Sequence, residues 1–149
     1  MTSSNTNLDS TKQKIQRLSL LLYAYAAIQA ITFLFVWLKN PEVTFSLFAV
    51  FGILISIFLA YVLPRRQGKV LYWVAITHVG LYLLRGLVAF ALVLFLFLTE
   101  NPAEVITSLS SMTWFIYLVG LILASLAGIS FIYLLKKDIR EYITGVSTK

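Results

Sequence analysis

Residues 70–98 read VLYWVAITHVGLYLLRGLVAFALVLFLFL, and Arg85 is the only charged residue among them. A helix needs about 20 apolar residues to cross the roughly 30 Å of hydrocarbon in a bilayer. Since this run exceeds that length, it predicts a transmembrane helix. Three further apolar runs reach the required length, at residues 18–38, 43–63 and 112–135.

The composition is typical of a membrane-embedded chain. Of the 149 residues, 60% are hydrophobic and 12% are charged, whereas a soluble domain has about 25% charged residues. The mean hydropathy is +0.89. A water-soluble fold cannot bury that much apolar surface, and no long polar stretch divides the chain. The sequence therefore predicts one domain, an all-α integral membrane protein with an antiparallel four-helix transmembrane bundle.

The segments outside this bundle are predicted to be short. We expect a flexible cytoplasmic N-terminal segment at 1–14, the four-helix transmembrane domain at 15–139 and a cytoplasmic C-terminal tail at 140–149. Ser10 and Gln13 can form a capping box, which predicts that the first helix begins there. Asn40-Pro41 and Asn101-Pro102 have the cap-then-proline order that starts a helix. Residues 101–111 are predicted to form a short helix on the outer surface.

Basic residues are distributed unevenly among the connecting segments. Lys and Arg number three before the first run, one in the first loop, three in the second, none in the third and four in the tail. Because cytoplasmic loops carry the excess of Lys and Arg, both termini and the second loop are predicted to be cytoplasmic. We therefore expect a multi-pass protein of the plasma (inner) membrane. The short first and second loops also predict that the helices they join are antiparallel neighbours.

A short motif occurs twice. Phe33-Leu34-Phe35 precedes Asn40-Pro41, and Phe95-Leu96-Phe97 precedes Asn101-Pro102. If this is a true repeat, the chain consists of two related helical hairpins, as in parallel-repeat transporters. The alternative is that Phe, Leu and Asn-Pro are simply common at helix ends near a membrane interface.

Two of the runs carry small residues at every fourth position. These are Gly52, Ser56 and Ala60 in the second run and Gly120, Ala124 and Gly128 in the fourth. Spacing by four puts each set on one helix face, and such a face lets two helices approach closely in lipid. The close contact lies either inside the bundle or against another chain.

The third run carries most of the polar residues that need an explanation. His78, Tyr82 and Arg85 are spaced by four and three, so they share one helix face. Arg85 lies about 22 Å along the helix from Val70, where an arginine costs about 2.5–3.5 kcal/mol on insertion scales. No Asp or Glu occurs in the four runs, so they offer Arg85 no acidic partner. Gln29, beside small residues of the first run, is expected to form an interhelical hydrogen bond.

Three interpretations of Arg85 follow. It snorkels or is held by carbonyls, Tyr82 and Gln29, and so stabilises the bundle. It meets an acidic helix of another subunit, or it binds an anionic ligand, a lipid headgroup or a transported anion. Each interpretation predicts that Arg85 faces protein or water and not lipid. Arg85, Tyr82, His78 and Gln29 are thus the candidate ligand- or partner-binding residues.

Several kinds of site are excluded or disfavoured. The chain has no cysteine, which excludes disulfides, thiolate catalysis and Cys-ligated metals. His78 is the only histidine, and one imidazole cannot build a zinc or haem site alone. We therefore expect no metal and no cofactor, and we expect His78 to be an interior hydrogen-bonded residue rather than a proton relay. Because the basic residues lie at the ends of the apolar runs, nucleic acid is not an expected partner.

No catalytic pair is visible, so the preferred hypothesis is a non-enzymatic accessory, assembly or interaction subunit of a membrane complex. Its expected partners are the lipid bilayer and either another membrane protein or further copies of the chain. The alternative is a small transporter or channel module, in which the Arg85 face handles an anion or metabolite. A third hypothesis is an immunity protein against a membrane toxin. In length and topology the chain resembles accessory subunit I of bacterial ATP synthases, although His78 and Leu81 do not match the acid and lysine of that family.

Overall fold

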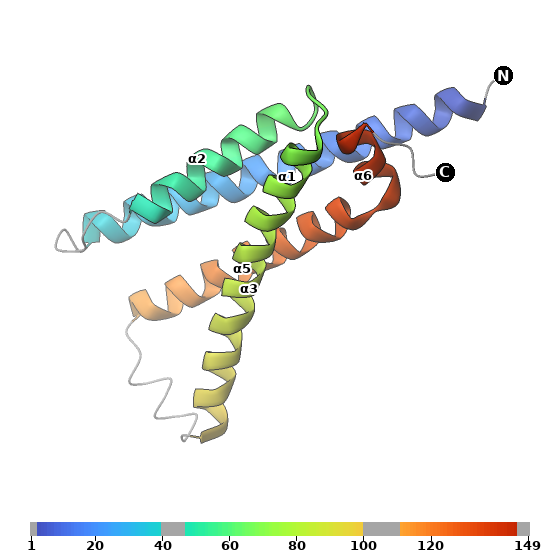
Figure 1. Ribbon diagram of the computed structural model, residues 1–149. Coiled ribbons are helices and arrows are strands. Elements are labelled where there is room, and N and C mark those ends of the chain that lie inside the picture. Colours follow the sequence, from blue (N-terminus) through green and yellow to red (C-terminus); the bar gives the residue numbers. More distant parts are fainter. Residues whose placement is uncertain (1–2, 40–46, 100–110, 146–149) are drawn as a thin grey trace.

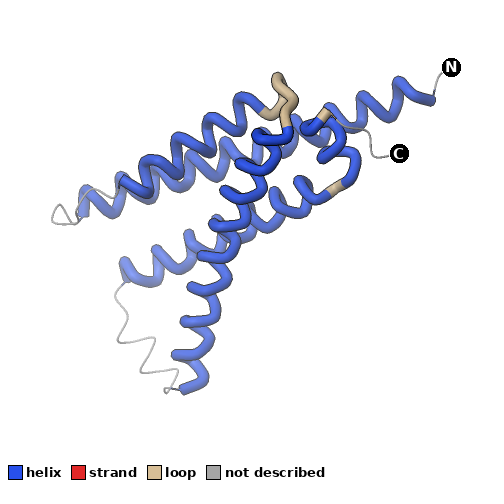
Figure 2. Tube along the Cα trace, in the orientation of Figure 1, coloured by secondary structure: helices blue, strands red, loops and turns tan. Residues whose placement is uncertain are grey.

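The computed structural model describes residues 3–39, 47–99 and 111–145. Within these ranges the chain is almost entirely helical and contains no strand (Figure 2). The helices are α1 (Ser3–Lys39), α2 (Leu47–Val62), α3 (Lys69–Thr99), α5 (Ser111–Leu135) and α6 (Lys137–Thr144). The predicted all-α class is therefore confirmed.

Three of these helices, α1, α3 and α5, are long and apolar enough to cross a membrane. The described part of α2 is also apolar but has only 16 residues. The first residues of the predicted run at 43–63 lie outside the described ranges. That four segments of the chain span the membrane therefore stays a prediction.

The long helices converge at one end of the molecule and diverge towards the other (Figure 1). The most extensive contacts join α3 with α5 and α1 with α2, followed by α1 with α5. Among the contacting pairs, α2 and α3 share the fewest contacts. α2 and α3 nevertheless meet as neighbours through side chains, Ser56 with His78 and Gly52 with Tyr82, while α3 packs more closely along α5.

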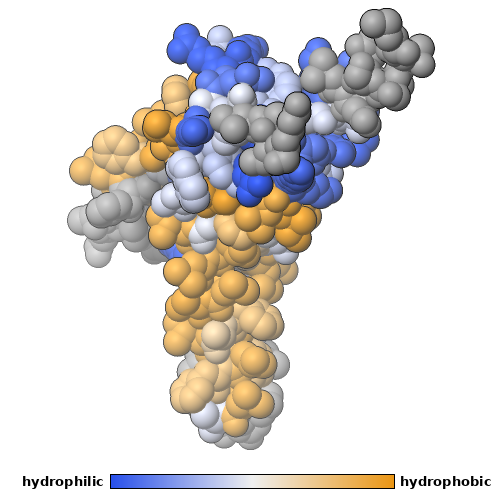
Figure 3. Space-filling model, turned by 45° about the vertical axis from the view of Figure 1, so that its right-hand side comes forward, coloured by the Kyte–Doolittle hydropathy of each residue, from blue (hydrophilic) through white to orange (hydrophobic). Residues whose placement is uncertain are grey.

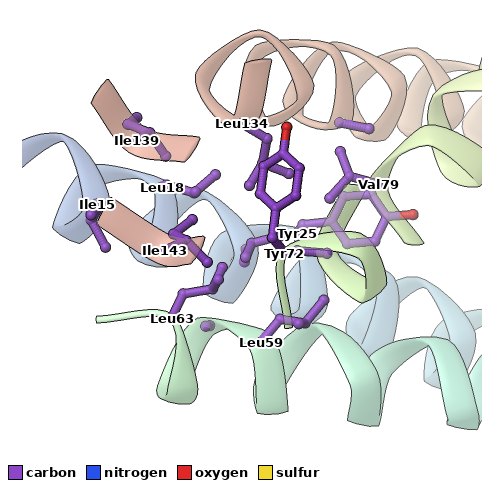
Figure 4. Close-up of a cluster of buried hydrophobic side chains, with 14 residues drawn as sticks. Ile15, Leu18, Tyr25, Leu59, Leu63, Tyr72, Val79, Leu134, Ile139 and Ile143 are labelled. Atoms are coloured by element: carbon purple, nitrogen blue, oxygen red, sulfur yellow. The ribbon is translucent and has the colours of Figure 1, made fainter. Parts of the chain in front are cut away.

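The buried core lies at the convergent end, and all five described helices contribute to it (Figure 4). Its members are Ile15, Leu18, Leu22, Tyr25, Leu59, Ala60, Leu63, Tyr72, Ala75, Val79, Ala127, Leu134, Ile139 and Ile143. Further out, α1 and α3 each contact α5 through an aromatic pair, Phe35 with Phe115 and Phe97 with Trp114.

The short helix α6 closes the convergent end. Ile139 and Ile143 are one turn apart, so they lie on the same face, and both are fully buried. The N–H of Gly68 donates to the carbonyl oxygen of Ile143 at 2.6 Å, which ties α6 to the start of α3. Gly145 ends the helix in the left-handed conformation with φ of 67°, where an absent Cβ avoids strain. α6 thus packs beneath the ends of the longer helices.

Several predicted boundaries differ from the structure. α1 begins at Ser3, so the prediction that Ser10 and Gln13 start the helix is wrong. Residues 3–14, predicted as a flexible segment, form its first turns, since no Pro or Gly interrupts them. Residues 140–144 of the predicted tail belong to α6. Both Asn-Pro pairs and the predicted outer helix, except Ser111, lie outside the described residues.

Apolar side chains cover the outside of the long helices. On α3, the exposed apolar residues are Val70, Trp73, Val74, Leu81, Leu84, Leu87, Val88, Phe90, Leu92, Leu94, Phe95 and Leu98. Figure 3 shows this apolar surface along the divergent limb, with hydrophilic residues gathered at the convergent end. An exposed apolar surface of this extent is unusual for a protein in water.

The core position of α6 can be tested by truncating Ile143. Ile143→Ala removes fully buried methyl groups, and we expect it to lower the free energy of unfolding by about 2–5 kcal/mol. Ile132→Ala is the matched control, because Ile132 is 61% exposed. Denaturant titration in mixed micelles, followed by circular dichroism, measures both variants. Equal losses in the two variants would contradict the core position of Ile143.

A second prediction concerns the ion pair between α1 and α6. Lys14 Nζ donates to Asp138 Oδ2 at 2.6 Å, and this hydrogen bond is the main reason why the pKa of the Asp138 carboxyl lies below its usual value. A lowered carboxyl pKa stabilises the fold above the unfolded-state pKa, and this contribution is lost as the pH falls through the folded-state pKa. Wild type should therefore lose more stability than Asp138→Asn between about pH 5 and about pH 3. The difference should be small, because both side chains are 36% exposed and solvent screens the pair. Unfolding titrations of both proteins across this pH range measure it. If the free energy of unfolding falls equally with pH in both, the prediction is wrong.

Candidate functional site

The polar face of α3 divides into a buried part and an exposed part. His78 and Tyr82 turn towards α1 and α2, where their rings pack edge to face with centroids 4.9 Å apart. His78 Nε2 lies 2.8 Å from Ser56 Oγ, and Ser56 Oγ donates to the carbonyl oxygen of Gly52 at 3.0 Å. Because the only hydroxyl proton of Ser56 is used for Gly52, His78 is placed to donate through its Nε2–H. His78 is thus a hydrogen-bonded interior residue.

Tyr82 occupies the space that the missing side chain of Gly52 leaves. A Cβ built on Gly52 would collide with the hydroxyl oxygen of Tyr82. The Tyr82 ring also packs edge to face on Tyr25, with centroids 5.1 Å apart, and its hydroxyl accepts a long hydrogen bond of 3.5 Å from Gln29 Nε2. Gly52 therefore positions Tyr82 beside two polar residues of α1.

A small cavity of about 10 Å³ lies within this group. Its polar lining consists of Tyr25, Ser56, His78, Tyr82 and Ser130. A space of this size accommodates about one water molecule where several polar groups surround it. The cavity can thus hold a hydrogen-bonded water between His78 and the two tyrosines.

Arg85 lies outside this buried group. The side chain is exposed, and within the described part of the chain it forms no hydrogen bond or ion pair. It lines a second cavity, an open cleft of about 770 Å³ bounded mainly by α1, α3 and α5. The structure thus brings Arg85 to a cleft wall, whereas the other three predicted polar residues contact one another.

This cleft has a polar deep end and an apolar remainder. Tyr25, Gln29, Tyr82 and Arg85 line it nearest the convergent core, while Phe33, Val36, Ala89, Phe90 and Val93 line it further out on α1 and α3. On α5 the lining residues run from Trp114 to Ala124. Gln29 Oε1 is buried and has no hydrogen-bond partner. The deep end therefore offers a guanidinium, hydroxyls and an amide with an unused acceptor.

Small residues allow close helix contacts, but not always with the expected partner. A Cβ on Gly86 of α3 would collide with Ala124 of α5, and a Cβ on Gly128 would only touch Leu83. Ser56 and Ala60 are buried, and Ser19 Oγ of α1 donates to the carbonyl oxygen of Ala60 at 2.5 Å. Gly120 has no heavy atom within 4 Å of its Cβ position, and it lines the cleft. Both sets thus contact α3 and not each other, and Ala60 also meets α1.

Sequence reasoning missed Tyr25, Gly86 and the partnership of Ser56 with His78. Tyr25 precedes Gln29 by four residues, a spacing that places both on one face of α1. Gly86 is an isolated glycine inside a helical pattern, which signals close packing when it is retained at a cost in helix propensity. The described residues contain no group of three or more His, Cys, Asp or Glu that could hold a metal.

The contact between Gly52 and Tyr82 gives a testable prediction. Gly52→Ala should lower the free energy of unfolding by about 1–3 kcal/mol, because overpacking forces Tyr82 to move. Tyr82→Phe in the same chain should restore part of this loss by removing the colliding hydroxyl. Gly120→Ala is the control, and it should be neutral or stabilising by up to about 1 kcal/mol. Denaturant titration of the three variants measures this, and strictly additive effects of Gly52→Ala and Tyr82→Phe would contradict the contact.

Comparison with known proteins does not assign a function to this site. Neither a scan of protein-family models nor searches of curated proteins and of solved structures found a match for this chain. An assignment of function therefore depends on the residues and cavities described above.

Proposed function

We propose that the chain is an integral, multi-pass protein of the plasma (inner) membrane. The proposal is supported by three helices that are long and apolar enough to span and by the apolar residues exposed along them. At the convergent end, Lys12, Lys14 and Arg17 accompany the basic residues of the loop between α2 and α3 and of α6. By the positive-inside rule, this end and both termini are on the cytoplasmic side.

Within the membrane, the protein acts by binding and not by catalysis, as an accessory or interaction subunit. One observation carries this proposal: Arg85 lies at the deep end of an open cleft without a hydrogen bond or ion pair to another described residue. A charged side chain at that depth is costly unless something offsets the charge. The binding partner therefore supplies an anionic group to Arg85.

A transporter or channel module is the second candidate, and one observation favours it. Tyr82 and Tyr25 line both the cleft and the small cavity beside His78. These two tyrosines place polar groups between the cleft at Arg85 and the small cavity nearer the convergent end. An anion or metabolite held at Arg85 would have polar groups on both sides of it.

Native mass spectrometry after purification in a mild detergent tests the binding role. Wild type should retain a bound species, either another chain or a small molecule, that Arg85→Gln retains at least about tenfold less, since hydrogen bonds to charged groups are worth about 1.5–3 kcal/mol. Lys39→Gln is the control, because it removes the same charge from an exposed position at the end of α1. Identical bound species in wild type and Arg85→Gln would refute the role of Arg85. Arg85-dependent anion flux in liposomes would instead favour the transporter.

A further inference from the structure

We propose that the cleft binds a single-chain amphiphile with one carboxylate, whose headgroup lies at Arg85 and whose hydrocarbon chain follows the cleft outwards. This inference rests on the proposed function and names the class of molecule that supplies the anionic group. Four properties of the cleft support it: polarity, length, volume and charge.

The polarity of the cleft matches an amphiphile. Gln29, Tyr82 and Arg85 come together at the deep end from α1 and α3, and Thr32, Trp114 and Tyr117 line the cleft further out. Beyond them the walls are mostly apolar, with Phe33 on α1, Phe90 on α3 and Phe115 on α5. A molecule with one polar end and a long apolar remainder satisfies both parts of this lining.

The length of the cleft corresponds to one leaflet. Its lining on α3 runs from Tyr82 to Val93, a distance of about 16 Å at 1.5 Å per residue. Half of a bilayer's hydrocarbon is about 15 Å thick. From Arg85 to Val93 the lining extends for about 12 Å, so a chain anchored at Arg85 would follow the cleft through most of one leaflet.

The volume of the cleft suits a small molecule. The cleft measures about 770 Å³, which is within the range of about 300–1,000 Å³ for small-molecule sites. A single hydrocarbon chain with one polar headgroup is a molecule of this class.

The charge of the cleft limits the headgroup to one negative charge. Among the described residues that line it, Arg85 is the only Lys or Arg, and none is Asp or Glu. A carboxylate neutralises one guanidinium and accepts two parallel hydrogen bonds from it. A phosphate monoester carries about −1.5 to −2 at neutral pH, so it would bring an uncompensated charge into the membrane.

The cleft is also accessible from the side. Phe90 is 50% exposed and Leu118 is 60% exposed, although both line it. A hydrocarbon chain can therefore reach the cleft from the surrounding lipid without passing through water. In the same deep end, the Tyr82 hydroxyl can donate to a carboxylate oxygen, and the unpaired Gln29 Oε1 can accept from a water beside it.

Photolabelling tests this inference on the full-length protein in nanodiscs of phosphatidylcholine. The probe is palmitic acid with a mid-chain diazirine, and mass spectrometry locates the labelled residues. We expect labels on the lining of α5 between Trp114 and Leu121 and on Phe90 or Val93 of α3. Labelling at these residues should fall at least about tenfold in Arg85→Gln and stay unchanged in Lys39→Gln. Circular dichroism checks that both variants keep the wild-type helix content.

Three further results separate the possible outcomes. Hexadecanol with the same diazirine should label the cleft far more weakly than the acid, and Arg85→Lys should retain part of the labelling. Equal labelling by acid and alcohol, independent of Arg85, would overturn the inference, because it would show only contact with lipid. Preference for diazirine-labelled phosphatidic acid would also overturn it. If native mass spectrometry still shows a protein partner whose binding depends on Arg85, the amphiphile inference is wrong but the proposed binding function stands. If no bound species depends on Arg85, the proposed function is wrong as well.

Discussion

The burial of Ile139 and Ile143 beneath the longer helices is the packing interaction on which the rest of the structure depends. These two side chains fill the space between α1, α3 and α5 at the convergent end. α6 is also tied to α1 by the Lys14–Asp138 pair and to the start of α3 through Gly68. Because one compact apolar cluster holds five helices at a single end, the arrangement of the opposite end is left to the crossing of α3 and α5.

That crossing creates the cleft. Gly86 lets the backbone of α3 approach Ala124 of α5 closely, and beyond this point α3 turns away from the α1–α2 hairpin (Figure 1). Gly120 lies one turn further out on α5 and meets no neighbouring atom. Two small residues on the same face of α5 thus have opposite consequences, since Ala124 receives a helix and Gly120 faces open space. The volume between α1, α3 and α5 follows from this divergence.

The sequence predicted the all-helical class and the grouping of polar residues on α3, because both follow from local patterns. Apolar runs set the length of α3 and α5, and the spacing of His78, Tyr82 and Arg85 sets their common face. α1 is longer than its apolar run, because it begins in a polar segment at Ser3. The sequence could not predict which helix each face meets, since Ser56, Gly52 and Gly86 are equally suited to several partners. α6 was missed because eight residues with a few apolar positions give a weak periodic signal. Its helicity depends on tertiary burial, which no local pattern records.

Some polar residues of the interior have partners for their hydrogen-bonding groups and others do not. The residues without partners mark the binding site. His78 and Ser56 satisfy each other and the backbone of Gly52. Gln29 keeps a buried acceptor without a partner, and Arg85 keeps its charge without an ion pair among the described residues. Unsatisfied polar groups lower the stability of the free protein. A ligand with an anionic group recovers this free energy at Arg85, whereas Gln29 Oε1 needs a donor such as a bound water. The deep end of the cleft is therefore where binding gains most, because it is where folding leaves the most polar groups unused.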